Sequence, residues 1–224
     1  MKLVYSDYGI EIEFEENKVQ VVVVESPVIY SALLRDLWAQ LNGDLGGFIL
    51  SERDKEYKLS QRAEGIFNPF AVNANNKKIL TKLYQELKDL ANEQLPDKTS
   101  LFNATLIEYL DNIVNLVPYH LKYEMTPDVS ALFKVYDIGI DTDDGSMLNV
   151  LVDYIRALRQ ICHIDILFLV GIKNYLSEAE LLQLYEAAAY EKMYLILFES
   201  SDRRLLEYER KLIIDSDCCI IKLE

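Results

Sequence analysis

Residues 20–38, QVVVVESPVIYSALLRDLW, hold the pattern that decides the fold class. Val21 to Val24 form an apolar run without polar alternation, which is typical of a strand buried on both faces inside a parallel sheet. A helix is expected directly afterwards, because Ser26 suits the N-cap position and Pro27 the first helical position. Apolar side chains then recur at helical spacing, at Leu33, Leu34, Leu37, Trp38 and Leu41.

The turn between this strand and this helix is where a P-loop protein holds nucleotide phosphates. A P-loop needs glycines, so that backbone N–H groups can wrap the phosphate oxygens, and a lysine that reaches the β and γ phosphates. The turn here reads ESPVIYS and contains neither residue type. Glu25 also places a negative charge where the phosphates would lie. The sequence therefore predicts the architecture of a P-loop protein without its nucleotide chemistry.

The flanking segments predict an α/β fold with a mostly parallel sheet. Two or three strands are expected within residues 1–24, and residues 51–76 read as loop with at most short elements. From residue 147 onward, helices alternate with the apolar strands 164–170, 193–198 and 218–223, and a charged helix is expected near residues 203–211. This alternation implies right-handed crossovers and helices that flank the sheet.

The middle of the chain has helical periodicity and no strand pattern for about forty residues. One apolar stripe begins at Ile79, and a second runs from Leu101 to Val117, with Pro96 between them. The short connection predicts an antiparallel helical hairpin. We therefore expect a helical leg of residues 74–116, inserted into an α/β head of residues 1–73 and 117–224.

Composition favours a cytoplasmic protein. The chain has 224 residues, half of them hydrophobic, which suffices for one substantial core. No apolar run is long enough to cross a membrane, and MKLVYSDYGI lacks the apolar block of a signal peptide, so no membrane partner is expected. Cys162, Cys218 and Cys219 match neither a disulfide framework nor a zinc site, and we interpret them as core thiols.

Charge is unevenly distributed along the chain. The net charge of −14 argues against a generic nucleic-acid binder. Residues 53–82 nevertheless hold seven basic side chains against three acidic ones. This segment is either a solvated loop and helix start, as most charged runs are, or a binding surface that an oligomer gathers around one axis.

Residues able to carry enzymatic chemistry are few. There is no Gly-x-Ser-x-Gly elbow, and we interpret His163, beside Cys162, as a structural histidine. Lys173 follows the strand ILFLV and is a candidate phosphate contact, although a single lysine after a strand is common. No acidic residue follows that strand to hold magnesium, so the sequence does not support nucleotide hydrolysis.

An acidic turn is the remaining candidate for a metal site. Asp141, Asp143 and Asp144 precede Gly145, as at the start of a calcium loop. Ser146 and Val152, however, occupy positions six and twelve of such a loop, where an EF-hand needs Gly and a bidentate Glu. The acidic turn therefore either caps a helix, through Asp144 or Ser146, or contributes to an irregular calcium site with oxygens from Glu124 and Asp128.

Three segments, in this order and spacing, carry a family resemblance over essentially the whole chain. They are QVVVVESPVIYSALLRDLW, then LKYEMTPDVSALFKVYDIGID (121–141), and IDILFLVG (164–171) with YLSEAELLQLYEAAAYEKMYLILFESS (175–201). The chain resembles the type II-A CRISPR-associated ring proteins that take part in spacer acquisition. No single segment is a unique signature of that family.

The resemblance implies a non-enzymatic protein with a P-loop-ATPase-like head and a helical leg. Members form ring-shaped homotetramers that thread onto the ends of linear double-stranded DNA through a hole lined with basic side chains. They act with the integrase complex and the effector nuclease of their locus, and bound calcium stabilises the ring.

Candidate site residues follow from the resemblance only in part. The family's acid-rich segment retains Glu124 and Asp128 here, beside His120 and Lys122. We therefore expect calcium ligands among Glu124, Asp128, Asp141 and Asp143. From local charge alone, the expected DNA contacts are Lys55, Lys58, Arg62, Lys77, Lys78 and Lys82. A nucleotide-binding enzyme on the same sheet, or a scaffold without DNA binding, remains the alternative.

Overall fold

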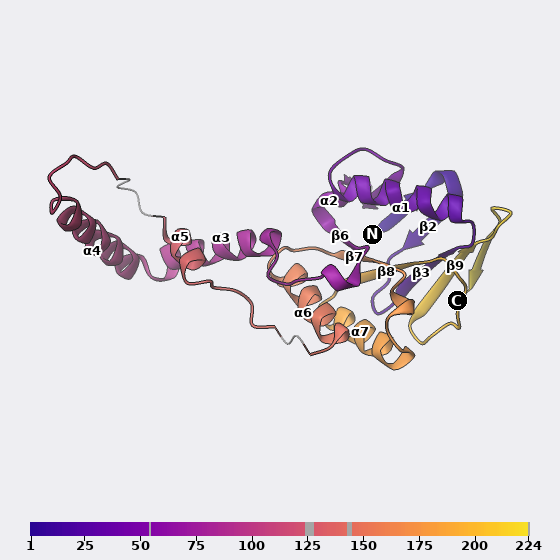
Figure 1. Ribbon diagram of the computed structural model, residues 1–224. Helices are drawn as coiled ribbons and strands as arrows, with labels where there is room; N and C mark the ends of the chain where they lie inside the picture. The colour runs from indigo at the N-terminus through magenta and orange to yellow at the C-terminus, as the bar shows by residue number, and fades with distance from the viewer. Residues whose placement is uncertain (54, 124–127, 143–144, 224) are drawn as a thin grey trace. The chain divides into compact units, whose positions relative to one another are not determined.

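A computed structural model describes residues 1–53, 55–123, 128–142 and 145–223. The chain divides into two compact units, which are coloured by residue number in Figure 1. We call residues 1–74 with 142–224 the head and residues 75–141 the leg. The leg is longer than the expected 74–116, because residues up to 141 group with its helices.

A six-stranded sheet forms the centre of the head, in the order β10-β9-β3-β8-β7-β6. Its strands are β3 (Val19–Val24), β6 (Ala63–Ile66), β7 (Ile166–Val170), β8 (Tyr194–Glu199), β9 (Glu209–Ile214) and β10 (Ile220–Leu223). Neighbouring strands are parallel except β9 and β10, which form an antiparallel hairpin. The valine run of β3 is fully buried between β8 and β9, which confirms the predicted parallel α/β fold.

Helices cover both faces of this sheet (Figure 1). α1 (Pro27–Leu41) and α2 (Leu59–Arg62) lie on one side, and α6 (Met147–Gln160) and α7 (Glu178–Tyr190) lie on the other. The predicted capping box starts α7: Ser177 Oγ accepts from Glu180 N at 3.3 Å, and Glu180 Oε2 accepts from Ser177 N at 2.8 Å. Short 3₁₀ turns occur at 6–8, 69–71 and 172–174.

The first two strands of the chain belong to a second sheet, which the sequence pattern does not distinguish from the main one. β1 (Lys2–Tyr5), β2 (Ile10–Glu13), β4 (Phe48–Glu52) and β5 (Lys55–Tyr57) are antiparallel, in the order β2-β1-β4-β5. Leu3 and Leu50 of this sheet share one apolar core with Leu33 of α1 and Phe198 of β8. The head is therefore built on two sheets that share a core.

The described part of residues 51–76 contains short elements, as expected, and one of them, β6, pairs in parallel with β7 at the edge of the main sheet. The expectations of a charged helix near residues 203–211 and of core thiols at the C-terminal cysteines are wrong. No helix forms at 203–211, because residues from Glu209 onward pair with β3 over six positions. Inter-strand pairing overrides the charged pattern there, since Glu209 and Lys211 are buried and ion-paired. Cys218 and Cys219 are exposed in the β9–β10 turn and are not core thiols.

The leg contains α3 (Lys77–Gln94), α4 (Pro96–Val114) and α5 (Val129–Val135). α5 packs on α3, with the Tyr84 and Phe133 ring centres 6.0 Å apart. The Asn75 side chain also exchanges hydrogen bonds of 2.9 and 2.7 Å with the backbone of Ile140. These contacts explain why the leg extends to residue 141.

α4 does not fold back along α3. Leu95 alone separates the two helices, and the first turn of α4 bonds the last turn of α3 through Thr99 Oγ1 and the Ala91 carbonyl, at 2.9 Å. No residue of the described helix α4 is buried. The expected antiparallel hairpin is therefore wrong, because it would bury a stripe of α4. Among the residues the structure describes, no helix is both long and apolar enough to span a membrane.

Candidate nucleic-acid interface

The turn from β3 to α1 lies where a P-loop would lie, but it lacks the glycine backbone that binds phosphate. Glu25 N donates to Ile214 O at 3.0 Å, and Pro27 has no N–H to offer a phosphate. The Tyr30 hydroxyl donates to Phe198 O at 3.2 Å. Burial and the neighbouring Glu199 carboxyl raise the pKa of Tyr30 to about 12. The turn is thus closed by contacts within the head, in agreement with its interpretation as an architectural remnant.

Lys173, the candidate phosphate contact after β7, is buried in an ion pair. Its Nζ lies 2.6 Å from Glu209 Oε1. Glu209 also accepts from the Tyr185 hydroxyl at 2.7 Å and from Leu206 N at 2.9 Å. Burial, with the Glu209 charge, raises the pKa of Tyr185 above its ordinary value. The ion pair keeps the Lys173 side chain buried in the head, so the expectation that Lys173 contacts a phosphate is wrong.

Three of the expected DNA contacts lie near one another in the head. Lys55 Nζ and the Arg62 guanidinium are 5.2 and 4.8 Å from the centre of the Tyr57 ring, and Lys58 precedes α2. Lys55 and Lys58 are exposed, whereas Arg62 is half-buried. Arg62 Nε donates to Asp165, so that its charge is already partnered. Lys55 and Lys58 are therefore accessible to a phosphate, whereas Arg62 forms an ion pair within the head.

The other three expected contacts lie in the first two turns of α3 in the leg. Lys77, Lys78 and Lys82 are exposed, and the spacing of four places Lys78 and Lys82 on one face. Asn76 caps this helix by accepting from Ile79 N at 3.1 Å. The N-terminal end of a helix carries a partial positive charge, so lysines there cost about 0.3–1 kcal/mol each. This unfavourable placement suits a surface that binds an anion.

The expected calcium ligands are described only in part. Glu124 and Asp143 lie outside the described residues. Asp128 caps α5 by accepting from Ser130 N at 3.1 Å and Ser130 Oγ at 2.6 Å, and it lies 3.2 Å from Lys88 Nζ. These contacts lower the pKa of Asp128 to about 2.

Asp141, the fourth expected calcium ligand, is exposed. Ser146 caps α6, accepting from Asn149 N at 3.2 Å, as the capping alternative predicted. In the part of the chain that the structure describes, no three Asp, Glu, His or Cys side chains form a metal-binding group. The calcium ligand set remains a prediction.

Two residues near Arg62 were not singled out from the sequence. Asp165, just before β7, accepts hydrogen bonds from Arg62 Nε and from Arg159 Nη1 of α6. Asp165 and Arg62 are 103 positions apart. Only the parallel pairing of β6 with β7 brings them together, and no local pattern announces that pairing.

Comparisons with known proteins found one matching family and several similar solved structures. The model of a family described as CRISPR-associated protein (Cas_Csn2) matches residues 40–218. The crystal structure of Stu0660 of Streptococcus thermophilus is similar, with a TM-score of 0.65 and 15% identity, over 100% of this chain and 76% of that one. MJ1267 in its ADP conformation, an ATP-binding cassette of an ABC transporter, gives 0.45 and 12% identity over 92% of this chain and 79% of that one. No curated protein matches.

Proposed function

Because the chain belongs to the Cas_Csn2 family of CRISPR-associated proteins, we propose that it is a non-enzymatic DNA-end-binding protein of spacer acquisition. In this proposal it binds the ends of linear double-stranded DNA without sequence specificity, as a ring-shaped homotetramer. Its partners are the integrase complex and the effector nuclease of the same locus.

The placement of lysines at the N-terminus of α3 carries the DNA-binding part of this proposal. Lys77 and Lys78 occupy the first two positions of the helix, and no acidic side chain lies in its first turn. Phosphate oxygens would interact favourably with both the lysines and the helix end. Contacts of this kind read the DNA backbone and not the bases, so the binding would be independent of sequence.

The overall charge supports a narrow DNA path. The whole chain has a net charge of −14, whereas residues 53–82 hold seven basic side chains against three acidic ones. An acidic surface repels DNA phosphates, and a basic patch attracts them. Assembly around an axis would gather one such patch from each subunit, which explains how an acidic protein can bind DNA.

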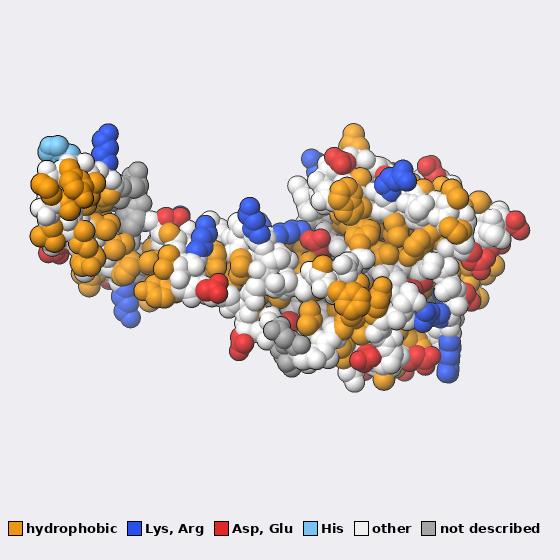
Figure 2. Space-filling view, viewed as in Figure 1, with side chains coloured by type: hydrophobic (Ala, Val, Ile, Leu, Met, Phe, Trp, Pro, Cys, Tyr) orange, Lys and Arg blue, Asp and Glu red, His pale blue; other side chains and the backbone are white. Residues whose placement is uncertain are grey.

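α4 supports assembly through the leg. Its described residues are all accessible, and Leu101 and Tyr109 are 70% and 61% exposed. Apolar side chains gather over α4 at the left of Figure 2. An unpartnered apolar helix face is typical of a surface covered by another protein. A second copy of the chain would cover it in the proposed homotetramer.

The internal contacts of the vestigial P-loop support a non-enzymatic role. The ESPVIYS turn offers no glycine cradle, and Lys173 is bound to Glu209. Detectable ATP turnover by the unmodified protein would revive the alternative of a nucleotide-binding enzyme.

Linear DNA should bind and closed circular DNA should not. A ring can thread onto a free end, whereas a circle of the same sequence offers none. In a gel shift at low salt, we expect retardation of the linear duplex that weakens steeply with added salt, because counterions compete for the phosphates. Equal retardation of linear and circular DNA would contradict end binding, and retardation of neither would favour the scaffold alternative.

Calcium is proposed to stabilise the assembly through Glu124, Asp128, Asp141 and Asp143. Carboxylate oxygens are the ligands that calcium prefers, and it tolerates irregular sites. Adding calcium should increase the assembled fraction in native mass measurements, and a chelator should reverse the change. Asp141→Asn should weaken this response. An unchanged mass distribution with calcium and with chelator would remove calcium from the proposal.

A further inference from the structure

A pocket of about 700 Å³ opens at the amino ends of the parallel strands in the head. Val19 and Tyr194, the first residues of β3 and β8, line it, together with Asp165 just before β7. Open α/β sheets ordinarily bind ligands at the carboxyl ends of their strands. This pocket therefore lies at the opposite edge from the vestigial P-loop, and its volume falls within the range of about 300–1,000 Å³ typical of small-molecule sites.

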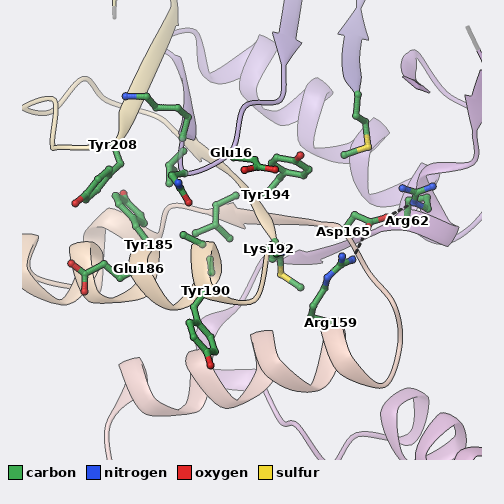
Figure 3. Close-up of a pocket in the computed structure, with 18 of the residues that line it drawn as sticks. Glu16, Arg62, Arg159, Asp165, Tyr185, Glu186, Tyr190, Lys192, Tyr194 and Tyr208 are labelled. Carbon is green, nitrogen blue, oxygen red and sulfur yellow. Dashed lines mark hydrogen bonds and ion pairs between the residues drawn. The ribbon is translucent and has the colours of Figure 1, made fainter. Parts of the chain in front are cut away.

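One end of the pocket presents oriented guanidinium groups. Figure 3 shows Arg62 and Arg159 joined through the Asp165 carboxylate at this end. Arg159 Nη1 also donates to Ile164 O at 3.3 Å, so both its position and its plane are fixed. Glu52 lies 3.7 Å from Arg62 Nη2, so a further anion is expected to bind chiefly to Arg159. Fixed guanidinium groups bind phosphate oxygens in a bidentate manner.

Tyrosine rings line the rest of the pocket. Tyr185 and Tyr208 lie at the end away from the arginines and Tyr194 lies between, whereas the Tyr190 side chain points to the other side of α7 (Figure 3). The Tyr194 ring is held in place by Phe14, with ring centres 4.9 Å apart, whereas Tyr185 is 2% exposed and its hydroxyl bonds the buried Glu209 at 2.7 Å. Tyr208 is 36% exposed and offers an open ring face. Fixed aromatic faces suit the stacking of a planar base, with little loss of side-chain entropy on binding.

Backbone strain is concentrated around the same pocket. Among the described residues, seven other than glycine have positive φ, and three of these, Asn17, Lys192 and Tyr208, line it. The φ of Tyr208 is 73°, which is costly for a bulky side chain. Strained backbone is retained mainly where it positions side chains for function. Lys18 and Lys192 add positive charge to the wall, and Glu16 and Glu186 add negative charge.

We propose that this pocket binds a nucleoside monophosphate, with its phosphate on Arg159 and Arg62 and its base among the tyrosines. The nucleotide is either free or the unpaired terminal nucleotide of a DNA strand. Binding of a free nucleotide follows from the pocket alone, whereas binding of a terminal DNA nucleotide also requires the proposed DNA-end binding. In the second case the pocket would distinguish frayed or overhanging ends from blunt ones.

Isothermal titration calorimetry on the full chain, with AMP and dTMP as probes, tests the proposal. We expect both nucleotides to bind and inorganic phosphate to bind more weakly. Arg159→Met should weaken nucleotide binding at least about tenfold, since it removes a charge-assisted contact. Arg156→Met is the matched control: it lies one turn earlier on α6, outside the pocket lining, and should leave the affinity unchanged. Tyr208→Ala, which removes a partly exposed ring of the lining, should weaken binding about fivefold or more.

Competition with DNA identifies the source of the nucleotide. Displacement of AMP by a duplex with a short overhang, but not by a blunt duplex, assigns the pocket to DNA ends, and displacement by neither assigns it to free nucleotide. Absence of nucleotide binding, equal affinity in Arg159→Met and Arg156→Met, or phosphate binding as tight as AMP would each overturn the proposal. If blunt duplex binding persists in that case, only the pocket fails. If duplex binding is lost while AMP still binds, only the DNA-end function fails.

Discussion

Replacing Lys77, Lys78 and Lys82 by glutamine should reduce the affinity for linear duplex DNA at least about 100-fold, since three charge-assisted phosphate contacts are lost. The slope of log affinity against log salt should fall by about 3, close to one for each contact removed. Fluorescence anisotropy with a labelled duplex, measured over a series of salt concentrations, gives both quantities.

The same variant should not be less stable than the unmodified protein. Lys77 lies at the first position of α3, at the positive end of the helix, so neutralising it should stabilise the helix by about 0.3–1 kcal/mol. DNA affinity and stability are thus expected to change in opposite directions, which a folding defect cannot produce. The matched control replaces Lys98, Lys122 and Lys134, three exposed lysines of the leg outside the basic segment. An equal loss of affinity in the control would show that net charge, and not position, governs binding.

Lys173→Met should lower the free energy of unfolding of the head by about 3–5 kcal/mol. The Glu209 side chain is 0% exposed, and the substitution leaves its carboxylate buried without the Lys173 charge. Within the described part of the chain, the Tyr185 hydroxyl and the Leu206 N–H would still bond it, but neutral donors compensate a buried charge poorly. Urea unfolding followed by circular dichroism measures the change.

Two further variants separate the buried charge from general effects of the substitution. Adding Glu209→Leu to Lys173→Met should restore much of the lost stability, because an apolar pair of similar volume requires no charge compensation. Lys2→Met removes an exposed pair with Glu11 and should leave the unfolding midpoint nearly unchanged. A loss below about 1 kcal/mol in Lys173→Met would show that the ion pair does not hold β9 and the preceding loop in place.

Local patterns predicted the long elements of the head well. The valine run, Pro27 at the start of α1, and the Ser177–Glu180 capping box all depend on neighbours within a few residues, and the structure confirms each. The main sheet follows from them, because parallel strands joined by helices have few possible topologies.

Elements that depend on distant partners were not predictable from local patterns. β6 is four residues long, includes Gly65, and is a strand only because β7 pairs with it. β9 has a charged sequence, and its burial depends on Lys173 and Asp202, which pair with Glu209 and Lys211. The alternating apolar pattern of β1, β2 and β4 predicts strands but does not show whether they join the main sheet or form another.

The candidate site was predictable in part for the same reason. Lys77, Lys78 and Lys82 are close in sequence and remain close on α3, so local charge was a sufficient guide. Arg62 was assigned by the same argument, but Asp165 engages it from a distant strand. The tyrosines of the pocket belong to separate elements and share no motif, so only the fold reveals that they line one cavity.

Retention on end-blocked DNA tests the central claim, threading of a ring over a DNA end, most directly. The protein is loaded onto a linear duplex biotinylated at both ends, streptavidin is then added, and the salt concentration is raised until phosphate contacts fail. Threaded rings should remain on the blocked duplex at a salt concentration that releases them from the same duplex with open ends. Equal release from blocked and open duplexes would contradict the account.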